Sequence, residues 1–283
     1  MSELKYLPIT HRSFVNTWEC DENAHWNVQF YFRAFQQASE ILPLQHGKPN
    51  PGAATAQSRH IRYHRELAAA TSVRVRSGVI TDGDLKGLIV HRLEDSQSGR
   101  LAATALDLPG YDPGGLPSVS PEDTEEARPR GVPAGPKQPE DTTPLLNDGT
   151  AFESHYSTTT AAETDSSGEV SANALCSRLT DSAPHVWDHI GITGEWLSGN
   201  NCGRVAVEFA MTRLAPIRAG TGLVLVSWVP VVEEKTMMLQ HQFEDIVTRQ
   251  PLAVAQVRAL VMDLSQRRAV PLPEFVRRTG DLK

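Results

Sequence analysis

The densest group of polar residues able to do chemistry is the segment 21–27, Asp-Glu-Asn-Ala-His-Trp-Asn. Asp21, Asn23 and His25 alternate along it, so an extended backbone would direct a carboxylate, an amide and an imidazole to one side. A long helix is predicted directly after the segment, and the free N–H groups at its start can polarise a carbonyl without a metal. In a plainer interpretation, Asp21 or Asn23 caps the helix and His25 only packs.

The elements that would position this segment follow from the hydrophobic pattern. A strand is predicted at 11–18, a polar break at 20–24 and a helix at 27–46. Gly47 closes the helix, and Pro43 should bend its last turn or end it early. Strand-like runs follow at 58–64, 72–81, 86–94 and 100–108. This order predicts an α+β unit in which one long helix packs on one face of an antiparallel sheet.

The second half of the chain repeats this order. Asp21 and Asp165 lie 144 residues apart, and His91 and His241 lie 150 apart within matching His-x-x-Glu-Asp segments. A strand is predicted near 155–161 and a helix at 172–189, with Pro184 late in it. Further strands are predicted at 204–212, 222–232, 236–247 and 252–264. Because the matches keep their order, a tandem duplication is the preferred account.

A proline-rich segment separates the two halves. Nine of the 19 prolines lie between Pro109 and Pro144, together with an acidic cluster at 122–126. With few aliphatic residues to offset chain entropy, most of 111–149 is expected to be extended or disordered. The predicted division is an N-terminal domain at 1–112, a linker at 113–150 and a C-terminal domain at 151–283.

Composition excludes several classes of protein for this chain of 283 residues. Its 27 Lys and Arg against 34 Asp and Glu give a net charge of −7, which is unfavourable for nucleic-acid binding. No run of 18 apolar residues and no signal-peptide core occur, so a cytoplasmic protein without a membrane partner is expected. Cys20, Cys176 and Cys202 lie far apart, which favours neither disulfides nor a thiolate metal site. No metal or cofactor is expected.

The run from Trp18 to Tyr31 resembles the signature of hotdog-fold acyl thioesterases. Its Asp-x-Asn-x-His spacing is especially similar to that of plant acyl-ACP thioesterases, which are tandem hotdogs. That group carries a further glutamate in a Tyr-Arg-Arg-Glu-Cys type segment, and residues 63–67 here are Tyr-His-Arg-Glu-Leu. Glu66 therefore matches, whereas Leu67 replaces the cysteine. The resemblance covers both copies and implies a tandem hotdog fold with the active pocket between them.

The resemblance implies a thioester hydrolase acting on acyl-CoA or acyl-ACP, with its catalytic residues in the first copy: Asp21, Asn23, His25 and Glu66. Leu67 argues against a thiol nucleophile, so water activated by Glu66 or Asp21 would attack, while Asn23 and His25 orient water and carbonyl. If Glu66 is only a surface residue, Asp21 alone would act as base or nucleophile, as in the similar 4-hydroxybenzoyl-CoA (aroyl-CoA) type branch. The expected substrate-binding residues are Trp26, Asn27 and Tyr31.

The second copy departs from this pattern. It keeps Asp165, but Ser167 replaces Asn23, Glu169 replaces His25 and Pro216 lies opposite Glu66. The second copy is therefore expected to have lost catalysis and to complete the pocket as a structural partner. The alternative is a second, different site formed by Asp165 and Glu169.

Two other functions stay open. Hotdog enoyl-CoA hydratases also place Asp and His near a helix start, but their Asp-x-Asn-Pro-x-His motif fits less well, because His25 follows Asp21 by four residues with no proline. A non-catalytic acyl-binding protein would require segment 21–27 to be only a cap. Since one chain contains both halves, a monomeric pseudo-dimer or a homodimer is expected.

Two further groups of residues have a plain interpretation and a functional one. His91 and His241 are predicted at strand ends, where a shared turn fits them better than a metal site. The arginine pairs 267–268 and 277–278 could contact coenzyme A phosphates or could be solvated surface.

Overall fold

A computed structural model describes residues 7–52 and 56–276, and within them the two halves of the chain contain the same elements. The first half has β1 (Ile9–Phe14), α1 (Val28–Gln45), β2 (Ser58–Tyr63), β3 (Ser72–Ile80), β4 (Ile89–Asp95) and β5 (Leu101–Leu108). The second half has β7 (Ala151–Thr158), α3 (Ala172–His189), β8 (Cys202–Arg213), β9 (Gly222–Val232), β10 (Thr236–Asp245) and β11 (Pro251–Asp263). The helix α4 (Gly194–Gly199) follows α3, and β12 (Arg268–Ala269) pairs with β11.

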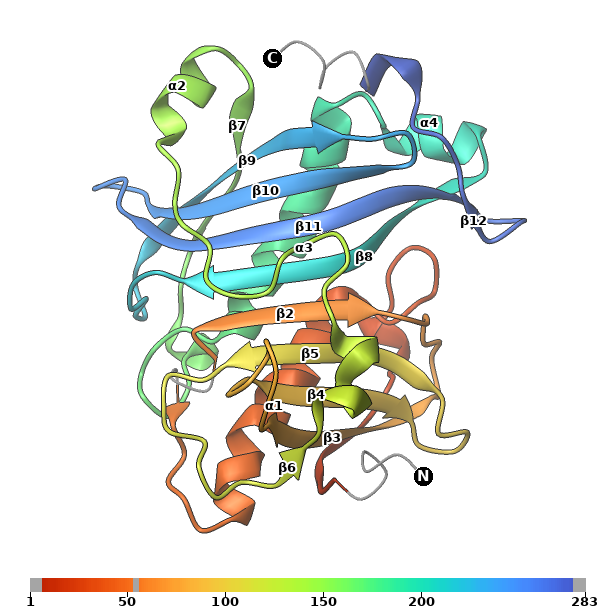
Figure 1. Ribbon diagram of the computed structural model, residues 1–283. Helices are drawn as coiled ribbons and strands as arrows, with labels where there is room; N and C mark the ends of the chain where they lie inside the picture. Colours follow the sequence, from red (N-terminus) through yellow and green to blue (C-terminus); the bar gives the residue numbers. More distant parts are fainter. Residues whose placement is uncertain (1–6, 53–55, 277–283) are drawn as a thin grey trace.

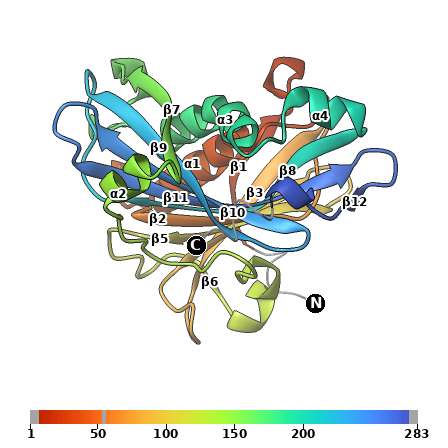
Figure 2. The same ribbon diagram turned by 90° about the horizontal axis from the view of Figure 1, so that it is seen from above.

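The strands of both halves form one continuous sheet, in the order β1-β3-β4-β5-β2-β8-β11-β10-β9-β7 (Figure 1). The halves meet where β2 and β8 pair antiparallel, with Ile61 opposite Phe209. Figure 2 shows α1 and α3 on the same face of this sheet. The two helices contact each other above the β2–β8 junction, so a site between the halves is bounded by both helices and by the sheet.

Each long helix begins where a polar side chain caps it. The Asn27 side chain accepts a hydrogen bond from the backbone N–H of Gln29 (3.1 Å), and Ser171 accepts one from that of Ala174 (3.2 Å). These contacts satisfy N–H groups that lack partners within the helix. Of the two effects predicted for Pro43, a bent last turn or an early end, the early end does not occur, because the helix continues to Gln45. So late in a helix, a proline removes little of the hydrogen-bond ladder.

The proline-rich segment was predicted to be extended or disordered, and it is ordered, with three short elements. It contains β6 (Ser118–Val119), the 3₁₀ helix η4 (Pro121–Ala127) and the short helix α2 (Thr142–Asn147), and it crosses the sheet face opposite α1 and α3 (Figure 2). Polar side chains of that face hold its backbone. The Glu208 carboxylate accepts hydrogen bonds from three consecutive N–H groups at 130–132, and Arg62 donates to the carbonyls of Glu126 and Arg128 (both 2.8 Å).

His91 and His241 lie within β4 and β10, not at strand ends as predicted, and both side chains are buried. Each Nδ1 atom pairs with a serine hydroxyl of the neighbouring strand, at 2.6 Å from Ser77 and 2.8 Å from Ser227. The two strands end at Asp95 and Asp245, four residues after the histidines. The two histidines are equivalent core positions of the duplicated fold.

The free energy of unfolding is expected to fall when the pH is lowered from 7 to 5, in part because of His241. Burial lowers the pKa of this side chain to about 3, whereas in the unfolded chain it titrates near 6.5. Between these values only the unfolded state binds the proton, so acid favours unfolding, by about 2 kcal/mol at pH 5 for one such group. Urea titrations at both pH values should show a smaller pH effect for His241→Gln; an unchanged effect would contradict this assignment.

Within the described residues, no helix is both long enough and apolar enough to span a membrane.

Candidate active site between the two copies

The segment 21–27 forms a tight turn, so the extended arrangement considered for it does not occur. Asp21 Oδ1 accepts hydrogen bonds from the backbone N–H groups of Asn23 (2.9 Å) and His25 (3.1 Å), and the N–H of Asp21 donates to the carbonyl of His25 (2.8 Å). Ala24 takes up the positive φ of 60° that the turn requires. Neither Asp21 nor Asn23 caps α1, since Asn27 does so. One oxygen of Asp21 thus fixes the shape of the turn.

The turn nevertheless brings the predicted residues together around one cavity, here called the polar cavity, of about 430 Å³. Its N-terminal wall contains Asp21, Asn23, His25 and Glu66. The opposite wall belongs to the C-terminal copy and contains Arg204–Val207, Met262, Leu264 and Arg267. The cavity therefore lies between the copies, with two carboxylates, an amide and an imidazole on one side.

Glu66 and His25 are neighbours within the polar cavity. Their Oε2 and Nε2 atoms lie 3.4 Å apart, and both side chains are about a quarter exposed, at 28% and 22%. The segments that carry them are joined by a hydrogen bond from the N–H of Trp26 to the carbonyl of Leu67 (2.7 Å). Arg267 reaches the same point, where it forms an ion pair with Glu66 and contacts His25 Nε2 (3.4 Å).

The charge state of His25 follows from its surroundings. Burial lowers the pKa of His25 below 6.5, while Asp21 opposes this shift and Arg267 reinforces it. At pH 7 the imidazole is therefore neutral, so it can accept one hydrogen bond and donate another. A neutral imidazole beside a carboxylate suits a site that moves protons.

The three residues predicted to bind substrate take different places. Trp26 and Tyr31 are almost fully buried and line the polar cavity, with their rings 4.6 Å apart. The Trp26 indole N–H donates to Glu19 (3.0 Å), and Tyr31 packs edge-on against Tyr63 (5.3 Å). Asn27 caps α1, accepts a hydrogen bond from Thr180 of α3 (3.3 Å) and lies on a second cavity instead.

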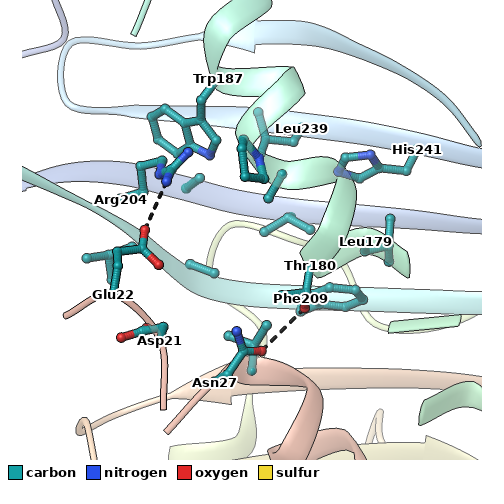
Figure 3. A pocket seen from close by; sticks show the side chains of 17 residues that line it. Asp21, Glu22, Asn27, Leu179, Thr180, Trp187, Arg204, Phe209, Leu239 and His241 are labelled. Atoms are coloured by element: carbon teal, nitrogen blue, oxygen red, sulfur yellow. Dashed lines mark hydrogen bonds and ion pairs between the residues drawn. The ribbon is translucent and has the colours of Figure 1, made fainter. Parts of the chain in front are cut away.

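This second, apolar cavity of about 160 Å³ lies between α3 and the C-terminal half of the sheet (Figure 3). Leu179, Ala183 and Trp187 line it from α3, and Phe209, Leu239, His241, Val257 and Ala259 line it from the strands. The two cavities adjoin, because they share the lining residues Asp21, Val28, Arg204, Val205 and Ala206. The apolar cavity was not predicted from the sequence, although its α3 residues fall on the buried face of a correctly predicted helix.

In the C-terminal copy the equivalent turn has different chemistry. Asp165 Oδ1 again accepts from the backbone at Ser167 (2.8 Å), but Glu169 forms an ion pair with Arg213 (2.6 Å). Pro216 occupies the position of Glu66, since the next residue, Ile217, receives the same backbone hydrogen bond as Leu67. Neither Asp165 nor Glu169 lines the polar or the apolar cavity.

The remaining candidates are possible metal ligands and the two arginine pairs near the C-terminal end of the sequence. Across residues 7–52 and 56–276, no three His, Cys, Asp or Glu side chains are grouped so that they could hold a metal ion. Arg267 faces the polar cavity, whereas Arg268 is exposed on β12. The pair 277–278 lies outside the described residues.

The chain belongs to the thioesterase-like superfamily, whose family model matches residues 15–111 and 159–279. The two matches fall on the two copies of the fold. A comparison with curated proteins finds no match. The family confirms the resemblance recognised in segment 18–31 and makes the chain a thioester hydrolase by class.

Solved structures of similar fold cover nearly the whole chain. An acyl-ACP thioesterase from Bacteroides thetaiotaomicron matches with a TM-score of 0.58 and 13% identity, over 92% of this chain and 100% of that one. A protein assigned as an oleoyl thioesterase from Lactobacillus plantarum matches with a TM-score of 0.60 and 12% identity, over 93% of this chain and 97% of its own. These structures confirm the predicted tandem hotdog architecture.

Proposed function

We propose that the chain hydrolyses the thioester of an acyl-CoA or acyl-ACP in the polar cavity of its N-terminal copy. The observation that supports this most directly is the meeting of Asp21, Asn23, His25 and Glu66 around one cavity that continues into an apolar one. A thioester hydrolase needs both a polar reaction centre and an apolar space for the acyl group.

In the proposed mechanism Glu66 is the general base. It lies partly buried beside the neutral His25, whereas one oxygen of Asp21 is already used by two backbone N–H groups. Glu66 takes a proton from water, and the resulting hydroxide attacks the thioester carbonyl carbon. Asn23 and His25 orient the water and the carbonyl oxygen, on which negative charge develops. The carbon–sulfur bond then breaks to give the carboxylic acid, and the leaving thiolate takes up the proton held by Glu66 and becomes the thiol.

The positive charge around the cavity suits the carrier group of such a substrate. Arg65, Arg204 and Arg267 all line the polar cavity. Both coenzyme A and the phosphopantetheine of a carrier protein bring phosphate groups, which guanidinium groups bind well. We therefore expect these arginines to bind the phosphates of the carrier group. The net charge of −7 does not conflict with this, because only a local basic patch is needed.

A hydrolysis screen tests the proposed function. The unmodified protein is incubated with acyl-CoAs and acyl-ACPs of increasing chain length, with aroyl-CoAs and with enoyl-CoAs; free thiol is measured, and for enoyl-CoAs also the absorbance of the double bond. Thiol release above the rate without protein is expected for at least one acyl class. Loss of an enoyl-CoA double bond without thiol release would indicate a hydratase instead. Binding of acyl thioesters without turnover of any of them would indicate an acyl-binding protein.

A further inference from the structure

The apolar cavity has a counterpart in the N-terminal copy, and there the space is filled. Strand register identifies the equivalent positions, since Arg59 pairs with Asp107 between β2 and β5 and Phe209 pairs with Val257 between β8 and β11. His91 and His241 match through their pairing with Ser77 and Ser227. Because α1 and α3 have equal length, Ser39 corresponds to Ala183.

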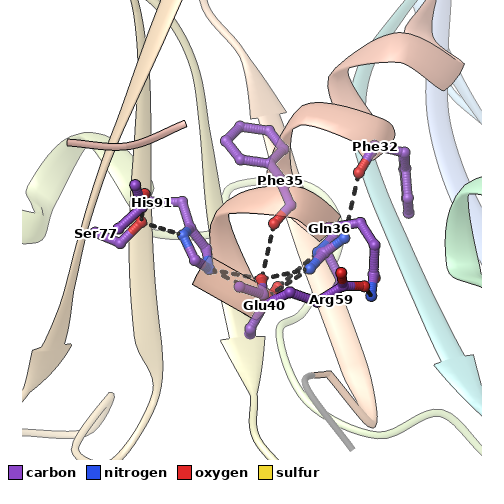
Figure 4. A network of polar contacts seen from close by, with 10 residues as sticks. Phe32, Phe35, Gln36, Glu40, Arg59, Ser77 and His91 are labelled. Atoms are coloured by element: carbon purple, nitrogen blue, oxygen red, sulfur yellow. Dashed lines mark hydrogen bonds and ion pairs between the residues drawn. The ribbon is translucent and has the colours of Figure 1, made fainter. Parts of the chain in front are cut away.

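In the N-terminal copy these positions form a buried polar network (Figure 4). The Asp107 carboxylate accepts hydrogen bonds from Arg59 Nε (2.7 Å) and Nη2 (2.6 Å), and Ser39 Oγ donates to it (2.6 Å). His91 Nε2 lies 3.1 Å from the same carboxylate. Arg59 is 1% exposed and Asp107 not at all. The network occupies the space between α1 and the sheet with paired charges.

In the C-terminal copy the same positions are Ala183, Phe209 and Val257, and all three line the apolar cavity. Of the four positions that meet at the Asp107 carboxylate, only the histidine is kept. Burial holds His241 neutral, so the inner part of the cavity carries no formal charge. Protein interiors are normally packed with few voids larger than a water molecule, so an apolar space of this size beside a polar site indicates a ligand.

We propose that the acyl group of the thioester occupies the apolar cavity under α3. This proposal rests on the proposed function. The reacting groups then come from the N-terminal copy and the acyl-binding site from the C-terminal copy. The Arg59–Asp107 network takes up the equivalent position under α1, so we expect the chain to bind one acyl group although its fold is duplicated. The shared lining residues Asp21 and Val28 mark the point at which the acyl group passes from one cavity to the other.

The occupant is an apolar chain or ring attached to pantetheine, the arm common to coenzyme A and acyl carrier protein. Each methylene that leaves water strengthens binding roughly fourfold. Affinity should therefore rise with chain length until the cavity is full. Because Val28, Met262 and Leu264 make part of the polar cavity apolar as well, variants of the apolar cavity are needed to show which cavity takes the chain.

Two variants fill the cavity in different ways. The triple variant Ala183→Ser, Phe209→Arg and Val257→Asp copies the N-terminal network into the C-terminal copy. Ala183→Leu adds only a larger apolar side chain, and it tests the proposal if the triple variant does not fold. His185→Leu is the matched control, because this residue is exposed on the same helix and does not line the apolar cavity.

The probes are S-alkyl pantetheine thioethers from methyl to decyl, which cannot be hydrolysed, and their dissociation constants are measured by calorimetry. The unmodified protein and His185→Leu are expected to bind the decyl probe at least about 100-fold more tightly than the methyl probe. Both cavity variants should reduce that ratio at least tenfold. No preference for decyl in the unmodified protein, or an undiminished preference in the cavity variants, would overturn the proposal. Because binding is measured without turnover, absence of thioester hydrolysis would count against the proposed function alone.

Discussion

Replacing Glu66 by Gln is expected to lower kcat for thioester hydrolysis by about 100-fold or more. The change keeps the size of the side chain but removes the group that takes the proton from water, and general-base catalysis contributes roughly 10²- to 10⁴-fold. Since Glu66 also pairs with Arg267 and lies 3.4 Å from His25, unfolding of the variant must be measured alongside its kinetics. A loss of kcat with unchanged thermal unfolding is the expected result.

Asp21→Asn shows which carboxylate acts as the base. The amide oxygen of Asn can still accept the two backbone hydrogen bonds that hold the turn, so the fold should survive. If Glu66 is the base, Asp21→Asn should keep far more activity than Glu66→Gln. Asp165→Asn is the matched control, because Asp165 accepts the equivalent backbone hydrogen bond in the C-terminal copy but lines neither cavity. Full activity of Glu66→Gln together with inactive Asp21→Asn would reverse the assignment.

The two long helices could be predicted closely because their signals are local. The predicted range 172–189 coincides with α3, and α1 begins one residue after its cap, Asn27. A periodic apolar face and a capping side chain lie within a few residues of each other, so they need no knowledge of the rest of the fold. The repeat itself was also visible, because the same order of elements recurs at nearly constant spacing.

Features that depend on distant partners could not be predicted. The proline-rich segment has too few apolar residues to order itself, and it is fixed by Glu208 and Arg62 on strands that lie elsewhere in the sequence. The shape of the turn at 21–27 could not be predicted, because nothing local shows that Asp21 Oδ1 binds two N–H groups. The family motif was enough to predict that the candidate residues lie together. The apolar cavity could not be predicted, because it depends on Phe209 and Val257, which pair between two strands.

The Arg59–Asp107 pair leads to a prediction about stability. Asp107→Val is expected to lower the free energy of unfolding by about 3–5 kcal/mol, because it leaves the guanidinium of Arg59 buried without its counter-charge. Burial alone would raise the pKa of Asp107, but the ion pair and hydrogen bonds with Arg59, together with His91, hold that pKa well below its ordinary value. The carboxylate is thus ionised in the folded protein, and its loss removes a full charge. Urea unfolding at pH 7 measures the effect.

The double variant Arg59→Phe and Asp107→Val gives the N-terminal copy the residues found at Phe209 and Val257. With both charges removed no ion stays buried alone, so the double variant should regain at least about 2 kcal/mol over Asp107→Val, although it has one more substitution. An additive or larger loss in the double variant would show that packing, and not charge pairing, makes these residues necessary. If the network fills an ancestral acyl site, the double variant should also bind S-decyl pantetheine at a second site. Calorimetry measures the number of probe molecules bound per chain. Two would show that the ion pair fills a former acyl site, and one would show that the N-terminal copy has no space for an acyl group.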